Sequence, residues 1–311
     1  MFHTKTPASE RRQALHEGLS SGRLMRFPGA FNPLSALLIE RLGFEGVYVS
    51  GAALSASLAL PDIGLTTLSE VAARSHEIAR TTALPTLVDA DTGFGEPLNT
   101  ARTVNVLEDL GLSGCHIEDQ VNPKRCGHLD GKEIVTAAEM RRRIKAAVGA
   151  RRDPGFAICA RTDARAVEGL SGAIERAKSY LDEGADIVFP DALEGASELE
   201  KFKQAVNAPV LANMTEFGKT ELLDAGTLAS IGVNIVIYPV TLLRLAMGAA
   251  ERGYGRSRPR VRKRGYWNRC NLGLNCTNFW GTTTTPRSTR GWERYERRSE
   301  RGQARPRWRN C

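Results

Sequence analysis

Residues 86–128 read TLVDADTGFGEPLNTARTVNVLEDLGLSGCHIEDQVNPKRCGH, and they contain the structural unit that recurs along the chain. The short apolar runs at 86–90 and 114–118 have the length and composition of buried strands. Between them, Leu98–Leu110 has the apolar spacing of a helix, and Gly111 follows it where a left-handed residue can close the last turn. The stretch therefore predicts a strand, a crossover helix and a second, parallel strand.

The same alternation continues to about residue 253. Apolar or β-branched runs lie near 24–27, 46–50, 86–90, 114–118, 156–161, 186–190, 209–212 and 233–237. Helical patterns cover 8–20, Pro33–Leu42, Leu68–Thr81, Leu98–Leu110, Thr136–Val148, Leu170–Glu183, Ala196–Val206, Lys219–Leu228 and Leu242–Arg252, and five helices are expected to end at Gly43, Gly111, Gly149, Gly184 and Gly232. Eight such units within about 230 residues predict an α/β fold, a (β/α)8 TIM barrel with an N-terminal helix.

The composition is that of a soluble α/β protein, with 41 % hydrophobic and 6 % aromatic residues among 311. The sequence has no run of eighteen apolar residues that would predict a membrane span. Residues 1–12 lack the apolar core of a secretory signal, so a cytoplasmic protein is expected. The six cysteines are scattered without a CxxC pair, which argues against a zinc or disulfide scaffold. Cys115 and Cys159 lie inside apolar strand patterns and are expected in the core.

The net charge of +8 averages two unlike parts of the chain. Residues 255–311 hold fifteen Arg and one Lys against three Glu, together with all four tryptophans, whereas the preceding residues carry an excess of acidic side chains. We therefore expect a barrel domain over 1–254 and a disordered, Arg/Trp-rich tail over 255–311. Two origins of the tail are open: translation of a shifted reading frame, or a basic extension that binds nucleic acid through phosphate contacts and base stacking.

Polar side chains gather where the predicted strands end. Because the active sites of such barrels lie at the carboxyl ends of the strands, these residues are expected to share one rim. They are Ser50, Asp89, Asp91, Glu118, Asp119, Arg161, Asp163, Asp191, Asn213 and Thr215. Any one of them could be an ordinary loop residue, but their common register with the strand ends indicates a site.

A metal site is predicted at the acidic part of this rim. Asp89 and Asp91 are two apart on a segment expected to be extended, so their carboxylates would point to one side. With Glu118 from the neighbouring strand, they offer the hard oxygen ligands that Mg²⁺ or Mn²⁺ prefers. The alternative is a solvated turn, since Asp-Thr-Gly is common in loops.

The segment Lys124-Arg125-Cys126-Gly127-His128 places a thiol among cations, which stabilise a thiolate. Cys126 could serve as an acid, a base or a nucleophile, on a loop whose glycine and proline suit closure over a substrate. The alternative is an exposed basic loop with an incidental cysteine.

Two strand ends suit a carboxylate ligand, and each also has a purely structural interpretation. Arg161 could bind a carboxylate with two hydrogen bonds, or it could pair with Asp163. Asn213 and Thr215 could hydrogen-bond the same ligand, or they could cap the helix predicted from Lys219.

The end of the second predicted strand has two interpretations as well. Ser50, Gly51 and Ala52 could form an anion site with a hydroxyl and close backbone, or only a tight turn. Tyr48, on the same strand face as Ser50, is a candidate proton carrier, although such a tyrosine commonly packs in a core.

Taken together, these stretches resemble one enzyme superfamily over residues 5–253. The resemblance is to the isocitrate lyase and phosphoenolpyruvate mutase superfamily, and within it to the 2-methylisocitrate lyases. The matching stretches are Val47–Gly51, Leu60–Asp62, Asp89–Gly95, Ile117–Gln120, Lys124–His128, Arg161–Ala164 and Asn213–Gly218. The cysteine-containing loop distinguishes the lyases of this superfamily from its mutase and decarboxylase branches.

The resemblance implies retro-aldol cleavage of (2S,3R)-2-methylisocitrate to pyruvate and succinate, a step of the methylcitrate cycle of propionate breakdown. Asp89 and Asp91 would hold Mg²⁺ with support from Glu118, and Cys126 would protonate the succinate enolate. The candidate catalytic residues are Cys126, Tyr48, His128 and Lys124. The candidate substrate-binding residues are Ser50, Gly51 and Ala52 for the pyruvate half, and Asp62, Cys126, Gly127, Arg161, Asp191, Asn213, Met214, Thr215 and Arg244.

The chain departs from the family pattern at three places. Ala52 stands where the family commonly has a third glycine-like position, and Asp191 stands where glutamate is usual. Residues 255–311 lack the family's Gln-Thr-Arg segment and the helix exchanged within its tetramers. Two alternatives therefore stay open beside a tetrameric methylisocitrate lyase. One is a related carbon–carbon lyase, or an enzyme like carboxyvinyl-carboxyphosphonate phosphorylmutase, acting on another small carboxylic acid. The other is a catalytically weak barrel whose basic tail binds nucleic acid.

Overall fold

The computed structural model describes residues 3–127, 129 and 131–255, and residues up to Ala250 belong to one compact unit. The strands are β1 (Met25–Pro28), β2 (Val47–Val49), β3 (Thr86–Asp89), β4 (Gly114–Glu118), β5 (Ala157–Thr162), β6 (Ile187–Pro190), β7 (Leu211–Asn213) and β8 (Ile235–Tyr238). The helices are α1 (Ala8–Ser20), α2 (Pro33–Arg41), α3 (Gly51–Ser57), α4 (Leu68–Ala79), α5 (Pro97–Asp109), α6 (Ala137–Ala150), α7 (Arg165–Asp182), α8 (Ala196–Val206), α9 (Ala225–Ile231) and α10 (Thr241–Gly255).

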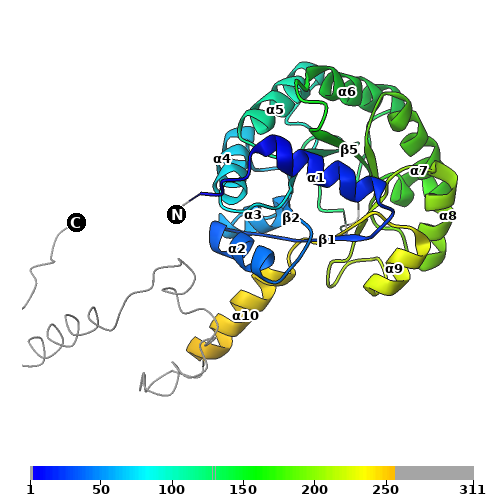
Figure 1. The fold of residues 1–311 in the computed structure, drawn as a ribbon. Helices are drawn as coiled ribbons and strands as arrows, with labels where there is room; N and C mark the ends of the chain where they lie inside the picture. The colour runs from blue at the N-terminus through cyan, green and yellow to red at the C-terminus, as the bar shows by residue number, and fades with distance from the viewer. Residues whose placement is uncertain (1–2, 128, 130, 256–311) are drawn as a thin grey trace, which may run out of the picture. The chain divides into compact units, whose positions relative to one another are not determined.

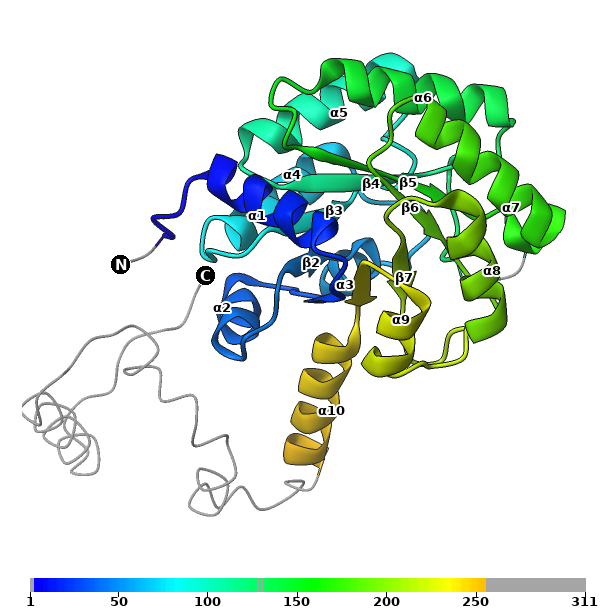
Figure 2. The ribbon, with the colours of Figure 1, turned by 45° about the vertical axis from the view of Figure 1, so that its right-hand side comes forward.

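The eight strands form a closed, parallel barrel, as predicted (Figure 1, Figure 2). Strands β2 to β6 form one sheet in sequence order, and β1, β8 and β7 form another. Two single parallel bridges, Gly29 with Tyr48 and Val188 with Val210, join the two sheets at both edges. Closure pairs the edge strands of the sheet. The strands are apolar on both faces because one face packs inside the barrel and the other against the helices.

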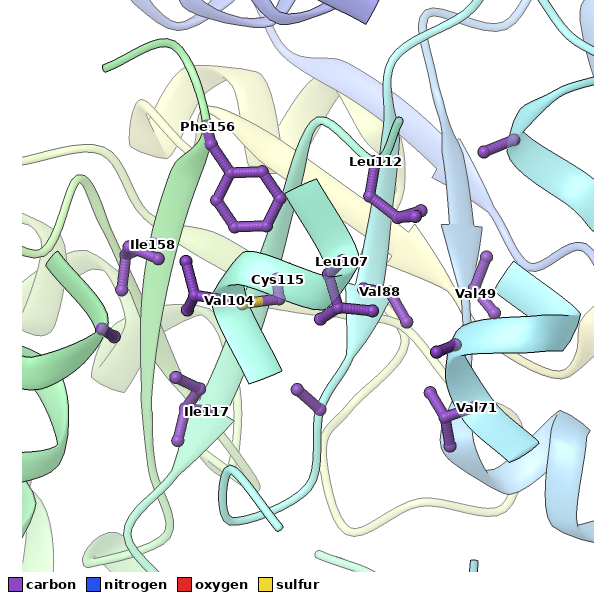
Figure 3. Packing of buried hydrophobic residues seen from close by; sticks show 14 of the residues in the cluster. Val49, Val71, Val88, Val104, Leu107, Leu112, Cys115, Ile117, Phe156 and Ile158 are labelled. Carbon is purple, nitrogen blue, oxygen red and sulfur yellow. The ribbon is translucent and has the colours of Figure 1, made fainter. Parts of the chain in front are cut away.

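Alternate strand residues fill two different layers. Phe27, Tyr48 and Phe189 lie in the cluster inside the barrel, which also includes Leu15 and Leu19 of α1. Val88 and Ile158 belong instead to the cluster between strands and helices, shown in Figure 3 with Val104 and Leu107 of α5. The two predicted core cysteines are both fully buried, Cys115 in the outer layer and Cys159 in the inner one.

Two predicted segments differ from the structure because of local capping. Residues 51–57 form helix α3, which was not predicted; the Ser50 side chain accepts a hydrogen bond from the Ala53 N–H and caps it. The helix predicted from Lys219 begins only at Ala225, where Asp224 is the capping residue. Asn213 and Thr215 therefore do not cap that helix.

Gly149 does not end a helix as predicted, because α6 continues to Ala150. Among the described residues, no helix is long and apolar enough to cross a bilayer. The predictions for the tail (disorder, a shifted reading frame or nucleic-acid binding) fall on residues outside the described range from 256 onward.

Candidate active site

The predicted rim is present at the carboxyl ends of the strands. Asp89 ends β3, Glu118 ends β4, and Glu118 pairs in register with Arg161 of β5. Ser50, Asp191 and Asn213 stand at the ends of β2, β6 and β7. These positions follow from the strand boundaries alone, because a parallel barrel gathers all its carboxyl ends on one side.

The two aspartates after β3 both lie beside the backbone of Gly51. A Cβ atom on Gly51 would be 2.8 Å from Asp89 Oδ2 and 3.5 Å from Asp91 Oδ1. The Gly51 N–H donates to Asp89 Oδ2 at 3.1 Å, and the Asp91 N–H donates to Asp89 Oδ1 at 3.0 Å. The expectation of an extended segment is wrong, because β3 ends at Asp89 and Asp91 has a φ of 44°.

The charges around these aspartates push their pKa values apart. Burial opposes ionisation of Asp89, but His116, Lys124 and Arg161 outweigh it and lower its pKa to about 2. Burial raises the pKa of Asp91 to about 6 although Lys124 opposes the shift. Burial also holds the pKa of Glu118 well above its usual value. The site therefore holds more carboxyl groups than its own cations stabilise as carboxylates.

Glu118 has the least compensated carboxyl group of this set. Its side chain is fully buried, and in the described part of the chain neither of its oxygens has a hydrogen-bond partner. Its nearest cation is Arg161, with Nε 3.2 Å from Glu118 Oε2. Its backbone N–H donates to the Asp91 carbonyl at 2.9 Å, which joins the ends of β3 and β4.

Lys124 holds the cysteine-containing loop against the aspartates. Its Nζ lies 2.5 Å from Asp62 Oδ1 and 3.1 Å from Asp91 Oδ1, and the side chain is only 3 % exposed. The side-chain amide of Gln120 binds both the N–H and the carbonyl of Arg125 at 2.9 Å. Asp62, predicted to bind substrate, is thus an ion-pair partner of Lys124 here. Cys126 follows, partly exposed, while His128 lies outside the described residues.

Arg161 is surrounded by carboxylates, so its structural interpretation holds in this structure. Its Nε and Nη2 bind the two oxygens of Asp163 at 2.9 and 3.0 Å, and Nη2 also binds Asp191 Oδ2 at 2.9 Å. Asn213 Nδ2 donates to the other oxygen of Asp191 at 3.3 Å. The ends of β5, β6 and β7 are therefore joined by one buried network.

Gly127 packs directly on this network. A Cβ atom at Gly127 would lie 1.6 Å from Asp191 Oδ2 and 2.4 Å from Arg161 Nη2, so only glycine fits. Because of this contact, Cys126, the residue before Gly127, lies on the Arg161 side of the rim. Lys132, which sequence reasoning missed, binds both the Gly127 carbonyl and Asp163.

His116 is a second residue that sequence reasoning missed. Its Nε2 lies 2.7 Å from the Tyr48 hydroxyl and 3.4 Å from Asp89 Oδ1, inside the barrel. Burial lowers the pKa of His116 to about 4 and raises that of Tyr48 well above its usual value, so both are neutral at pH 7. Its place on the same strand face as Glu118 was the available signal.

Three predicted substrate residues have other contacts in this structure. Met214 packs in the apolar cluster between the sheet and the helices, because strand alternation turns it away from the side that Asn213 faces. Arg244 pairs with Glu216 at 2.9 Å and is 3.5 Å from the Thr215 hydroxyl. Their roles in binding substrate stay predictions.

The acidic side of the rim fits a magnesium ion that keeps part of its water shell. Mg²⁺ is commonly held by one or two carboxylates, several waters and the substrate. Asp89 and Asp91 supply such carboxylates, and the fully buried Glu118 at the end of the next strand has two oxygens without a hydrogen-bond partner in the described part of the chain. Within the described ranges, no three His, Cys, Asp or Glu side chains converge on one metal position. Glu118 thus suits a supporting place rather than that of a third direct ligand.

A closed parallel barrel with a buried charged cluster at its carboxyl rim defines an enzyme of the TIM-barrel class. A model of the phosphoenolpyruvate phosphomutase family matches residues 13–256. Probable 2-methylisocitrate lyase 2 of Corynebacterium glutamicum is 63 % identical over 255 residues, which cover 82 % of this chain and 83 % of that protein. The chain belongs to the isocitrate lyase and phosphoenolpyruvate mutase superfamily, and within it to the carbon–carbon lyases.

Two solved structures are similar to the barrel. Oxaloacetate acetylhydrolase in complex with 3,3-difluorooxalacetate is 33 % identical, with a TM-score of 0.79 and coverage of 82 % of this chain and 88 % of that one. Phosphonopyruvate hydrolase in complex with oxalate and Mg²⁺ is 30 % identical, with a TM-score of 0.76 and coverage of 94 % and 98 %.

Proposed function

We propose that this chain cleaves 2-methylisocitrate to pyruvate and succinate with the help of Mg²⁺. The observation that carries the proposal is the packing of Gly127 on the Arg161–Asp191 pair, since Cys126 is the residue before Gly127 and this pair belongs to the buried cations and acids of the rim. The high identity to a probable 2-methylisocitrate lyase supports this choice of substrate.

The reaction needs a proton removed from the substrate hydroxyl and a proton delivered to the carbon that becomes part of succinate. Loss of the hydroxyl proton lets the carbonyl of pyruvate form as the carbon–carbon bond breaks, and the electron pair stays on the succinate fragment. The Cys126 Sγ–H donates the proton that this carbon then takes. Tyr48 is our candidate to take the hydroxyl proton. Because its phenol is neutral, it would accept this proton only while it passes its own proton to Nε2 of the neutral His116, 2.7 Å away.

The remaining residues bind and orient the substrate. Ser50, Gly51 and Ala52 would bind the pyruvate half, and Arg161 and Asn213 the carboxylates of the succinate half. A magnesium ion at Asp89 and Asp91, supported by Glu118, would stabilise the negative charge that develops on the pyruvate side. Lys124 and its partners would exclude water from this charge. We also expect a cytoplasmic homotetramer, as the family resemblance implies.

Removal of divalent metal should abolish the activity. EDTA-treated, dialysed protein given 2-methylisocitrate is expected to form pyruvate and succinate at less than about 1 % of the rate regained with Mg²⁺, because a metal ion contributes several kcal/mol to such charge stabilisation. Both products are measured by liquid chromatography, and Mn²⁺ should restore part of the rate. Undiminished cleavage without metal would contradict the magnesium proposal, and absence of cleavage with Mg²⁺ would contradict the substrate.

Asp91→Asn is expected to stabilise the metal-free protein at neutral pH while removing its stabilisation by Mg²⁺. The pKa of Asp91 is raised to about 6, so the folded state favours its neutral form, and ionisation above that pH costs stability of roughly 1–3 kcal/mol. The gain of the variant should therefore be absent below about pH 4, grow between about pH 4 and pH 6, and stay constant at higher pH. Urea unfolding with EDTA measures it. Ser21→Ala, at the exposed end of α1, is a control without this pH dependence, because the hydroxyl bonds only to the backbone of Gly18 and Arg23.

A related acid is the second candidate substrate, because Asp191 is shorter than the glutamate usual in the family. Its two oxygens are bound to Arg161 and Asn213. The shorter side chain would leave more space beside the succinate half of the substrate. Comparing the specificity constants for 2-methylisocitrate, isocitrate, 2,3-dimethylmalate and oxaloacetate decides between them.

Nucleic-acid binding by the tail would appear as salt-dependent RNA or DNA affinity that is lost on truncation after Gly253.

A further inference from the structure

Lys132 is a buried cation with two hydrogen-bond partners in the site. Its side chain is 2 % exposed, and its Nζ donates to the Gly127 carbonyl at 2.6 Å and to Asp163 Oδ1 at 2.8 Å. A lysine is seldom buried this deeply unless its charge is paired, because the ammonium group is strongly solvated in water. The two bonds therefore join the cysteine-containing loop to the end of β5.

The first of these bonds fixes the position of Gly127. The glycine has no room for a side chain above the Arg161–Asp191 pair, so its backbone is already in contact with that pair. The Lys132 ammonium group donates to its carbonyl at 2.6 Å and holds it there. Cys126 is the adjacent residue, and its own carbonyl accepts from the Leu129 N–H at 2.9 Å in a tight turn. Displacement of Gly127 would therefore move the thiol.

The second bond fixes the partner of Arg161. Asp163 Oδ1 accepts a hydrogen bond from Lys132, and both oxygens of Asp163 accept from Arg161. The Asp163 backbone N–H donates to Asp119 Oδ1 at 2.8 Å. Asp119 in turn accepts from the hydroxyls of Thr162 and Tyr180. The carboxylate is thus anchored to the barrel, and Lys132 connects the loop to a rigid point.

We propose that Lys132 is a positioning residue that holds Cys126 over the substrate site by clamping Gly127 to Asp163. It acts through these two residues and does not itself touch the reacting atoms. The proposal rests on the proposed function for its effect on catalysis, but its structural part concerns the accessibility of one thiol and is independent of the substrate.

The chain offers a closely matched control in Lys203. That lysine donates to a carbonyl five residues away, Ala208 at 2.8 Å, and to a side chain 31 residues away, Asn234 at 2.9 Å. Lys132 has the same two sequence separations to its partners. Lys203 lies on α8, outside the rim, so Lys203→Met removes the same kind of clamp without touching the Cys126 loop.

The test measures alkylation of Cys126 by iodoacetamide in the full-length protein, followed on the Cys126 peptide by mass spectrometry so that other cysteines do not interfere. Lys132→Met is expected to raise the rate about tenfold or more, since a lost charged hydrogen bond corresponds to such a factor. Lys203→Met should leave the rate within twofold of the wild type. With 2-methylisocitrate, Lys132→Met should also lower kcat by about 10²-fold with little change in KM, because misplacement of a reacting group acts on the chemical step.

Lys132→Gln tests the same contact if Lys132→Met does not fold. Lys132→Gln retains a neutral donor and should give an intermediate alkylation rate in folded protein, judged by circular dichroism. Wild-type alkylation rates in whichever of these variants fold would overturn the proposal. If the alkylation rates rise as expected but no variant and no wild-type protein cleaves 2-methylisocitrate, the clamp stands and the proposed substrate fails.

Discussion

Cys126→Ala is expected to lower kcat for 2-methylisocitrate cleavage by about 10²–10⁴-fold, the range that a positioned general acid contributes. The thiol is the proposed proton donor to the succinate carbon, whereas other residues are proposed to bind the substrate carboxylates. KM should therefore change by no more than about threefold. The measurement is steady-state pyruvate formation, with succinate quantified in parallel.

Cys115→Ala is the matched control for this prediction. Cys115 is fully buried in the outer layer of the barrel and faces the helices, so its loss should cost some stability but leave kcat near the wild-type value. Cys126 is only partly buried, so Cys126→Ala should shift the free energy of unfolding by less than about 0.5–1 kcal/mol. Full activity of a folded Cys126→Ala protein would show that another group delivers the proton.

Arg161→Met is expected to cost about 3–5 kcal/mol of folding stability and to remove measurable activity. The substitution leaves Asp163, Asp191 and Glu118 buried without the cation that joins them. Burying a charge without its partner costs more free energy of folding than the intact pair contributes. Arg161→Lys keeps the charge but not the planar fork that binds two carboxylates at once, so it should recover only part of both losses. Urea unfolding and product formation measure the two effects.

The pH dependence of this stability loss has a definite sign. Burial opposes ionisation of Asp163, but Arg161 and Lys132 outweigh it and lower its pKa below the usual value. The stabilisation by this carboxylate is thus present above about pH 4 and is lost as the pH falls further. The deficit of Arg161→Met should be largest near pH 7 and shrink below pH 4. Arg141→Met, which breaks the more exposed pair with Glu183, should cost less than about 1 kcal/mol.

The barrel and the identity of its rim could be predicted because their signals are local. A short apolar run marks each strand in the sequence. In a closed barrel of eight parallel strands, the carboxyl ends of all strands lie on one side. Asp89, Glu118 and Arg161 were therefore placed at neighbouring strand ends from sequence, and the structure puts them there. Helix α3 was missed because Ser50 and Gly51 permit both a turn and a capped helix, and residues 51–57 are too short for a clear period.

The partners within the rim could not be read from the sequence. Lys132 and His116 had no motif to mark them, since their contacts are with Asp163, 31 residues away, and Tyr48, 68 residues away. Arg161 had two open interpretations. The positions of Asp163 and Asp191 show that it is ion-paired in this structure, and its binding of a substrate carboxylate stays a prediction. Asp62 likewise became a partner of Lys124 through a contact spanning 62 residues.

The sequence by itself determined the fold class and the gathering of polar residues at the strand ends, because hydrophobic periodicity and the strand-end rule act along the chain. The role of the Cys126 thiol stays a prediction. The tertiary structure decided which charges meet: Lys124 with Asp62 and Asp91, Arg161 with Asp163 and Asp191, and Lys132 with the loop of Cys126. The physical reason is that the energy of a buried charge depends on distance through space and on burial, neither of which sequence separation records. The same burial sets the pKa of Asp91 to about 6 and that of Asp89 to about 2, although the two residues are almost adjacent in the chain.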